Sequence, residues 1–327
     1  MDELSRFQME RVTGNEADLA HWLLRDAATG RELCGVRVTA AASADAGMVG
    51  DLAERFFARD LTLEFRQHPG IARTVGVVRK DTSVWLLHER PPGLPVVDLL
   101  RHGSLPVPEI AAIALAVLNI LSDAHARGFV WGYLAAAQVW VQPDRSVVLS
   151  GSGTGDLIGL GWISQQARLL RFAPELSPLA DPDPAADMWA VGHIIASLLA
   201  GRPQPLVRPG PAADVSCADL DRLLTGQARA LAPLVHGLLR RETEIRLTEP
   251  IIRRALARLA DGWPSWSHMP PVVPEDPQSG PTRSTHPWPL LPPQPPEYPP
   301  DVRHPVTRGR HRLPKRARAV IPGRPKS

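Results

Sequence analysis

The pattern of hydrophobic and polar residues changes along residues 1–262. The first part alternates in the manner of β-strands, whereas the second part carries apolar residues at helical spacing. Residues 109–127 predict a buried helix, and residues 187–202 predict a second, mostly apolar helix that ends at Gly201. Between them, residues 139–151 predict two short strands around a turn. Strands followed by helices indicate an α+β domain.

From residue 263 onward this pattern is lost and proline becomes frequent. Proline has no backbone N–H group and does not fit the interior of a helix. Residues 263–327 are therefore predicted to form a disordered, Pro-rich tail with local polyproline II structure.

The positive charge of the chain lies in this tail. The whole chain carries a formal charge of +3, and residues 303–327 hold nine Lys and Arg residues and no acid, so the remaining residues carry −6. The basic end is either a solvated segment or one that contacts nucleic acid, an anionic surface or an acidic protein face.

The sequence predicts neither a transmembrane segment nor a secretory leader nor a cysteine-based site. No run of eighteen apolar residues is present, and the N-terminus is acidic and polar. Cys34 and Cys217 lack the spacing of a disulfide framework or a metal site, which favours a reducing, cytoplasmic location.

Several short motifs follow one another in an order that resembles the bacterial serine/threonine protein kinase domain. Two of them are Arg-Phe-Ala-Pro-Glu at 171–175 and Asp-Met-Trp-Ala-Val-Gly at 187–192. Further segments resemble the first hairpin (6–33), the third strand (33–39), the αC helix (54–71), the fifth strand and hinge (83–93), the approach to the catalytic loop (124–129) and a late arginine segment (238–248). No single motif is specific to the family, whereas their common order is.

The resemblance implies an α+β, bilobal protein-kinase-like fold. Residues 1–93 would form a small antiparallel β N-lobe with the αC helix and the hinge, and residues 94–262 a mostly helical C-lobe. Residues 263–327 would follow as the tail.

Three residues match family positions with structural roles. Glu175 and Arg246 fall where the family has a largely buried ion pair. Asp187 matches the residue that holds the backbone of the catalytic loop, although a carboxylate at the start of a helix is an equally good interpretation.

At the positions that carry out phosphoryl transfer in the family, this sequence has residues without the charged groups that the reaction uses. Such transfer needs phosphate clamped, Mg²⁺ held by oxygen ligands, and a carboxylate near the substrate hydroxyl. Tyr133 takes the place of the catalytic aspartate, Ala135 that of the lysine, Gln138 that of the asparagine and Gly151 that of the metal-binding aspartate. A phenol titrates near pH 10, so it is a poor base at neutral pH, whereas Gln138 offers an amide oxygen.

The glycine-rich loop that would hold a nucleotide is also altered. It keeps Gly14 but has Glu16 and Leu19 at the other two glycine positions, with Asp18 between them. Backbone approach to phosphate is lost and negative charge is added.

Three more nucleotide-binding positions differ from the family pattern. Arg37 replaces the strand-three lysine, and Arg59 falls on the αC glutamate unless a rotated helix brings Asp60 there. In the hinge, Glu89 is followed by Arg90 and then by Pro91, which stands where an N–H group would bond adenine.

These replacements favour a pseudokinase, a kinase-like domain that regulates or scaffolds other proteins without catalysis. The partner expected from the resemblance is a genuine kinase or a phosphopeptide-binding module, and no cofactor is expected. The alternative is a degenerate but active serine/threonine protein kinase that binds ATP and Mg²⁺ through Gln138 and acids from Glu16 or Asp18.

Overall fold

The computed structural model describes residues 6–16, 19–39, 68–80, 83–103, 105–155, 173–175, 183–201, 222 and 224–260. The predicted αC helix at 54–67, most of the segment after residue 155, Cys217 and the tail at 263–327 lie outside these residues. The chain divides into two compact units, residues 1–273 and 274–327, so the boundary between them falls within the predicted tail.

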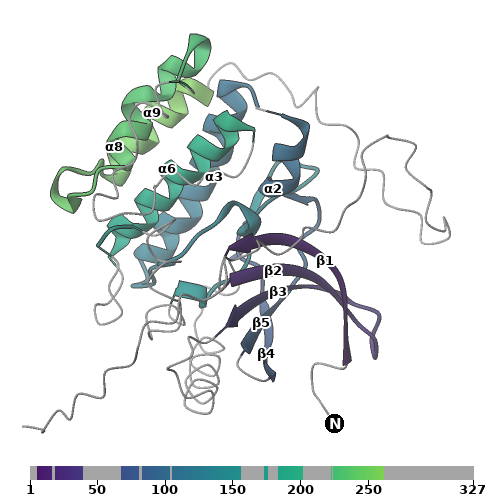
Figure 1. Cartoon of the computed structure of the whole chain (residues 1–327). Coiled ribbons are helices and arrows are strands. Elements are labelled where there is room, and N and C mark those ends of the chain that lie inside the picture. Colours follow the sequence, from purple (N-terminus) through teal and green to yellow (C-terminus); the bar gives the residue numbers. More distant parts are fainter. Residues whose placement is uncertain are drawn as a thin grey trace, which may run out of the picture. The chain divides into compact units, whose positions relative to one another are not determined.

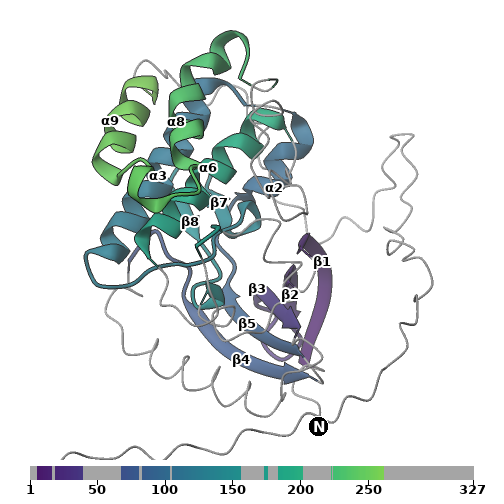
Figure 2. The same cartoon turned by 60° about the vertical axis from the view of Figure 1, so that its left-hand side comes forward.

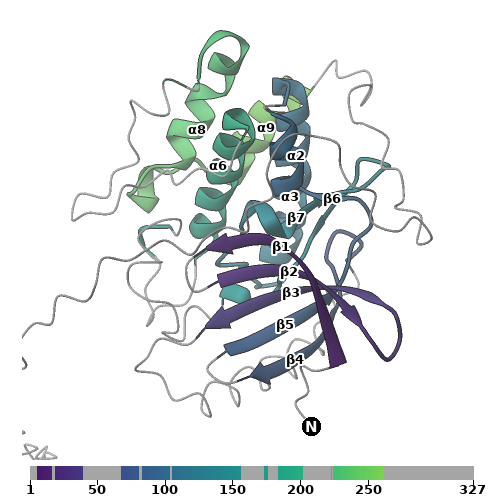
Figure 3. The same ribbon diagram turned by 45° about the vertical axis from the view of Figure 1, so that its right-hand side comes forward.

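In the described part, five strands form one antiparallel sheet in the order β1-β2-β3-β5-β4, which Figure 3 shows in full. Every neighbouring pair in this sheet is antiparallel. The strands are β1 (Phe7–Glu16), β2 (Leu19–Asp26), β3 (Glu32–Thr39), β4 (Thr74–Lys80) and β5 (Ser83–Glu89).

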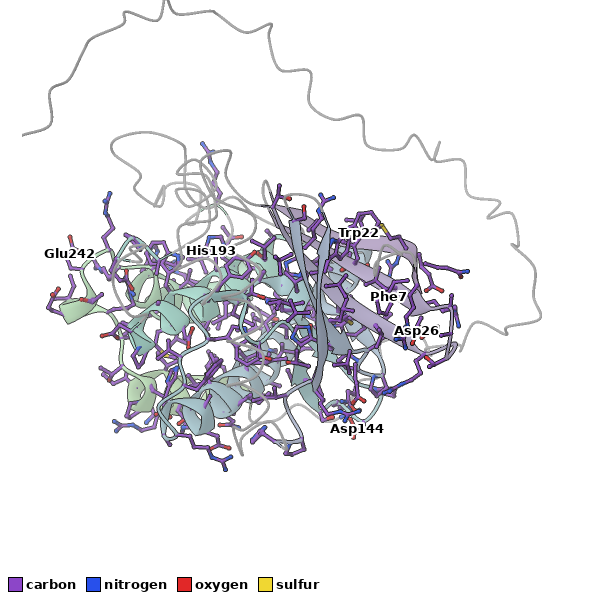
Figure 4. The ribbon with its side chains drawn as sticks, turned by 90° about the horizontal axis from the view of Figure 1, so that it is seen from below. Phe7, Trp22, Asp26, Asp144, His193 and Glu242 are labelled. Carbon is purple, nitrogen blue, oxygen red and sulfur yellow. The ribbon has the colours of Figure 1, made fainter. Side chains whose placement is uncertain are left out.

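The sheet buries apolar side chains on both faces. One face carries a cluster of Leu24, Leu33, Val78, Trp85 and Leu87, with Phe7 and Trp22 packed against it. The other face brings Leu23 and Cys34 against Trp140 and Val148, which come from the second half of the chain. Figure 4 shows Phe7 and Trp22 on the strands, and His193 and Glu242 among the helices.

The second half of the described chain is mainly helical and contains a three-stranded sheet in the order β6-β7-β8. Figures 1 and 2 show α3, α6, α8 and α9 gathered side by side. The helices are α2 (Val96–Leu99), α3 (Val107–His125), α6 (Pro184–Ala200), α8 (Ala232–Leu238) and α9 (Glu249–Ala260), with 3-10 turns at Leu100–His102, Ala136–Gln138, Gly226–Leu231 and Thr243–Ile245; the strands are β6 (Leu94–Pro95), β7 (Val139–Val141) and β8 (Val147–Leu149).

Helix α6 has clear start and stop signals. The Asp183 side chain accepts a hydrogen bond from the Ala185 N–H at 2.7 Å, and Pro184 occupies the first turn. The helix ends at Gly201, whose φ of 62° is the left-handed conformation that glycine adopts without strain. The predicted helices at 109–127 and 187–202 and the paired strands at 139–151 are thus confirmed to within a few residues.

Helix α3 is long and apolar enough to cross a membrane by length and composition, and it is the one such helix in the described part of the chain. Its apolar side chains, among them Ile110, Val117 and Leu121, belong instead to the large cluster that α6, α8 and α9 complete. We therefore interpret α3 as the core helix of this fold. The high mean hydropathy of α3 follows from its burial.

The turn between β2 and β3 is held by Asp26. Its carboxylate accepts two hydrogen bonds from the Arg6 guanidinium at 2.6 and 2.7 Å, one from the Thr29 hydroxyl at 2.7 Å and one from the Ala28 N–H at 3.0 Å. The hydrogen bond from Arg6, followed by that from Thr29, lowers the pKa of Asp26 well below its usual range.

We expect Asp26→Asn to lower the urea midpoint of unfolding at pH 7. Because the pKa of Asp26 is lowered in the folded protein, its contribution is complete above the pKa of an unfolded aspartate, about 3.9, and is lost as the pH falls toward the folded pKa. The difference between wild type and Asp26→Asn should therefore shrink between about pH 4 and pH 2. Arg6→Gln should reproduce the loss at pH 7, and a difference that is independent of pH would contradict this interpretation.

Candidate functional site

The loop at residues 131–138 is attached to the start of α6 through Asp187. The fully buried Asp187 carboxylate accepts hydrogen bonds from the Trp131 N–H at 2.9 Å and the Gly132 N–H at 2.8 Å. The His125 Nε2 atom lies 2.8 Å from the same carboxylate. Asp187 therefore holds the loop backbone in the structure, and it does not also cap α6, because the Asp183 side chain does so.

Tyr133 is buried and lies against the sheet. Its ring is stacked on that of His21 in β2, with 6.5 Å between the ring centroids and an interplanar angle of 12°. The side chain at this position of the loop thus contributes an apolar surface to the junction between the sheet and the helical part. A neutral phenol packed on a ring offers no carboxylate to a substrate hydroxyl.

Gln138 is fully buried and connects two loops. Its Oε1 atom accepts a hydrogen bond from the Ala135 N–H at 2.8 Å. Its Nε2 atom donates to the Gly151 carbonyl at 3.3 Å and to the Thr154 hydroxyl at 3.4 Å. The amide that sequence reasoning considered as a metal ligand is therefore engaged in holding residues 135–138 to residues 151–154.

The space beside Gly151 is occupied by this amide. Gly151 has a φ of 81°, and a Cβ atom built on it would overlap the Gln138 side chain, with Cδ at 3.0 Å. Gly155 is equally close to the other loop, because its Cβ would lie 3.0 Å from the Tyr133 backbone nitrogen. A carboxylate at position 151 has no room in this arrangement.

Trp140 in β7 fills the junction next to the hinge. It is 1% exposed and packs with Leu23, Cys34, Ala72 and Val148. The indole Nε1 donates to the Ser150 hydroxyl at 3.1 Å, so the buried polar atom is satisfied. The sequence placed Trp140 in one of the two strands predicted at 139–151, and the missed signal was a large aromatic residue directly after the altered catalytic loop.

Arg90 covers the indole from the hinge side. Its guanidinium carbon lies 6.0 Å from the Trp140 ring centroid, and the same group pairs with Glu32. Pro91, which follows, is buried and has no N–H group to offer a ligand.

The register of the sheet corrects the prediction for Arg37. In an antiparallel pair, directly opposite residues lie on the same face. His21 is opposite Val36 and Leu23 is opposite Cys34, so these residues share the face that meets Tyr133 and Trp140.

Arg37 is opposite Trp85 and lies on the other face, with its guanidinium carbon 5.9 Å from the Trp85 ring centroid. Val36 therefore stands where sequence reasoning placed a cation. The error is a one-residue offset, and in a strand such an offset exchanges the two faces.

Glu89 closes the strand before the hinge. Its carboxylate pairs with Arg73 and, at 2.6 Å, with Arg31. The hydrogen bond from Arg73, followed by that from Arg31, lowers the pKa of Glu89. The Glu89 N–H donates to the Arg73 carbonyl at 2.8 Å, so both parts of the residue are used to join β5 to the segment before β4.

The Glu175 and Arg246 side chains form a bidentate ion pair. Arg246 is 4% exposed, and one of its nitrogens lies 2.9 Å from Glu175 Oε2. The guanidinium also donates to the carbonyls of Arg240, Arg241 and Ala185 and lies 5.3 Å from the Trp189 ring centroid. The pair therefore ties residue 175 to the end of the helical part.

Other predicted positions are only partly described. Gly14 and Glu16 end β1 and are opposite His21 and Leu19 of β2. Asp18, Arg59 and Asp60 lie outside the described residues.

Within the part of the chain that the structure describes, no three His, Cys, Asp or Glu side chains come together as a metal site. The residues at Tyr133, Gln138 and Gly151 do not fit a magnesium–nucleotide site.

Comparison with known proteins supports a kinase-like domain. The chain is 25% identical over 141 residues to serine/threonine-protein kinase PAK 4 of Homo sapiens, a match that covers 42% of this chain and 24% of that protein. It is 28% identical over 142 residues to mitogen-activated protein kinase kinase kinase 3 of Arabidopsis thaliana, covering 42% and 22%. It is 25% identical over 145 residues to serine/threonine-protein kinase pak-2 of Caenorhabditis elegans, covering 42% and 27%.

These matches cover about a quarter of the length of each relative. No model of a protein family matches the chain. The antiparallel sheet followed by helices fits the α+β, kinase-like fold that the similarity indicates.

Gly151→Ala should destabilise the protein more than Gly128→Ala. Both glycines have a positive φ, 81° and 74°, so both substitutions carry a backbone cost of about 1–2 kcal/mol. A Cβ at Gly128 meets no atom within 4 Å, whereas one at Gly151 overlaps Gln138. We expect Gly151→Ala to cost about 2 kcal/mol more in the free energy of unfolding, measured with urea.

The double variant Gln138→Ala/Gly151→Ala separates crowding from backbone strain. Relief of the overlap should make its loss smaller than the sum of the two single losses. Equal losses for the two glycine variants, or strict additivity, would show that Gln138 does not fill the space at Gly151.

Arg246→Met should lower the free energy of unfolding by about 3 kcal/mol, because it leaves Glu175 and three backbone carbonyls without their donor. The matched control is Arg253→Met, which breaks a half-exposed pair with Glu249 one helical turn away and a hydrogen bond to the Asn119 side chain. That change should cost less than about 1 kcal/mol. Similar losses in the two variants would argue against a structural role for the buried pair.

Proposed function

We propose that this chain is a pseudokinase, a protein-kinase-like domain that binds and regulates another protein in bacterial signalling without transferring phosphate. The observation that carries the proposal is the Gln138 amide, which bonds to the Gly151 carbonyl and fills the space beside it. A metal-binding carboxylate at position 151 would overlap this side chain, and the Gln138 amide oxygen already accepts a hydrogen bond from the Ala135 N–H.

The proposal is strengthened by a contrast between residues at structural positions of the kinase fold and residues at its catalytic positions. Asp187 still holds the loop backbone, and Arg246 still pairs with Glu175. The loop that Asp187 holds carries Tyr133, Ala135 and Gln138, which supply packing and hydrogen bonds within the protein. A fold maintained without the charges for phosphoryl transfer is suited to presenting a surface.

The proposed partner is a protein, either an active kinase or a phosphopeptide-binding module, and the proposed location is the cytoplasm. Support for a signalling role comes from the similarity to serine/threonine protein kinases.

A transfer assay with γ-labelled ATP and Mg²⁺ tests the absence of catalysis. We expect no incorporation above a heat-denatured control, and no magnesium-dependent rise in melting temperature with ATP. The variants Tyr133→Phe and Gln138→Leu identify the source of any label. Incorporation by the wild type that Gln138→Leu abolishes would establish an active kinase, because that alternative relies on the Gln138 amide. Label that persists in both variants would come from a co-purifying kinase.

The same full-length chain, tagged and recovered from its native host, tests for a partner. Proteins enriched over a denatured bait are then purified and their binding measured directly, with the full chain and with a chain ending at residue 262. Saturable binding to a kinase or to a phosphopeptide-reading protein supports the proposal. If no recovered protein binds the folded chain directly, the regulatory role is wrong.

A further inference from the structure

An ion pair joins the edge of the sheet to the helical part. The Arg11 guanidinium in β1 donates to both oxygens of Asp98 in α2, at 2.9 and 2.6 Å. Asp98 is 7% exposed in its side chain, and Arg101 lies 3.5 Å from the same carboxylate. A planar, bidentate contact of this kind fixes both distance and orientation between the two elements.

A second set of contacts crosses the junction near Ser152. Its hydroxyl lies 3.2 Å from that of Thr74 in β4, and its carbonyl accepts a hydrogen bond from the His88 Nε2 atom in β5 at 3.3 Å. On the same side, the Ala72 N–H donates to the Leu149 carbonyl and the Leu149 N–H donates to the Gly70 carbonyl, both at 2.8 Å. Strand β8 is thereby joined to the segment that leads into the sheet.

Trp140 fills part of the same junction. The indole packs against Leu23 and Cys34 of the sheet and is 1% exposed. Next to it, the rings of His21 and Tyr133 face each other. Aromatic rings of this size bury a large apolar area, so they hold the two halves together without any bound molecule.

We infer that the sheet and the helical part are held in one fixed arrangement by the chain's own side chains, with Trp140 as the filler and Arg11–Asp98 as the clamp. The arrangement is therefore the same with and without nucleotide. The surface that both halves present to a partner is permanent.

This inference rests on the proposed function in one respect, since a domain that turns over no ATP has no need to open and close between its halves. The two ideas fail separately. Phosphate transfer would overturn the proposed function, whereas opening of the junction by a nucleotide would overturn only the fixed arrangement.

Cys34 provides a reporter for this junction. It packs against Trp140, and burial raises the pKa of its thiol, so the closed protein should react slowly with a thiol reagent. In a Cys217→Ser background it is the one cysteine left in the chain. The rate of its reaction with 5,5′-dithiobis(2-nitrobenzoic acid), measured at several urea concentrations, separates local opening from global unfolding.

Each part of the junction has a matched control. Arg11→Gln is compared with Glu10→Gln, because Glu10 pairs with Arg25 inside the sheet. Trp140→Ala is compared with Trp189→Ala, since both indoles are 1% exposed but Trp189 lies in the helical core. Trp140→Phe replaces Trp140→Ala if the alanine variant does not fold.

We expect Arg11→Gln to speed the labelling of Cys34 about tenfold and Trp140→Ala to speed it more strongly. In both variants the faster labelling should occur through local opening of the junction, whose rate depends little on urea. Glu10→Gln should leave the rate near that of the wild type. Trp189→Ala should act only through global unfolding, which depends steeply on urea. ATP with Mg²⁺, ATP alone and ADP should leave the wild-type rate unchanged.

Two outcomes overturn the inference. One is equal labelling rates in each variant and its control, which would mean that Arg11 and Trp140 do not hold the junction. The other is a change of the wild-type rate with any of the nucleotides, which would mean that a ligand takes part in closing it.

Discussion

The hydrogen bonds of the buried Gln138 amide determine how the two loops of this site are arranged. A buried amide must satisfy both its donor and its acceptor, and Gln138 does so by bonding to the loop before it and to the loop after β8. These hydrogen bonds hold the two loops so close together that a Cβ atom at position 151 or 155 would overlap the facing loop, so glycine fits at both positions. The conformation that places Tyr133 against His21 belongs to the same closely packed loops.

Around this contact, large apolar side chains lie where the resemblance to kinases implies charged ones. Tyr133 and Trp140 bring rings to a region where the resemblance to kinases implies carboxylates and a nucleotide base. Apolar burial favours a closed junction, whereas clustered charges would need metal or water to compensate them. The charges that remain, on Asp187, Glu175 and Arg246, are each paired with donors or acceptors inside the fold.

The sequence was sufficient to predict the class of fold and most of its elements. The helices at α3 and α6 have strong apolar patterns, and the cap of α6 is set by Asp183 and Gly201, so local signals were enough. The flanking motifs also place Tyr133 and Gln138 in order along the chain, so the sequence directs attention to this loop. What the residues contact could not be predicted, since Gln138 meets Gly151 only through folding.

The misplaced Arg37 shows where sequence reasoning reaches its limit in a sheet. A motif alignment finds the correct strand, but the face of a residue depends on whether its position is even or odd, and one residue of error reverses it. Trp140 was overlooked for a related reason. Its sequence neighbours are Val139 and Val141, as in any buried strand. Only its contacts with Cys34 and Arg90 show that it lies at the junction between the sheet and the helical part.

The crowding at Gly151 also limits which substitutions this position accepts. An aspartate introduced there would overlap Gln138 unless that side chain were shortened, and shortening it would remove three hydrogen bonds. The two positions therefore depend on each other, because the Gln138 amide that crowds position 151 also forms a hydrogen bond with the Gly151 carbonyl.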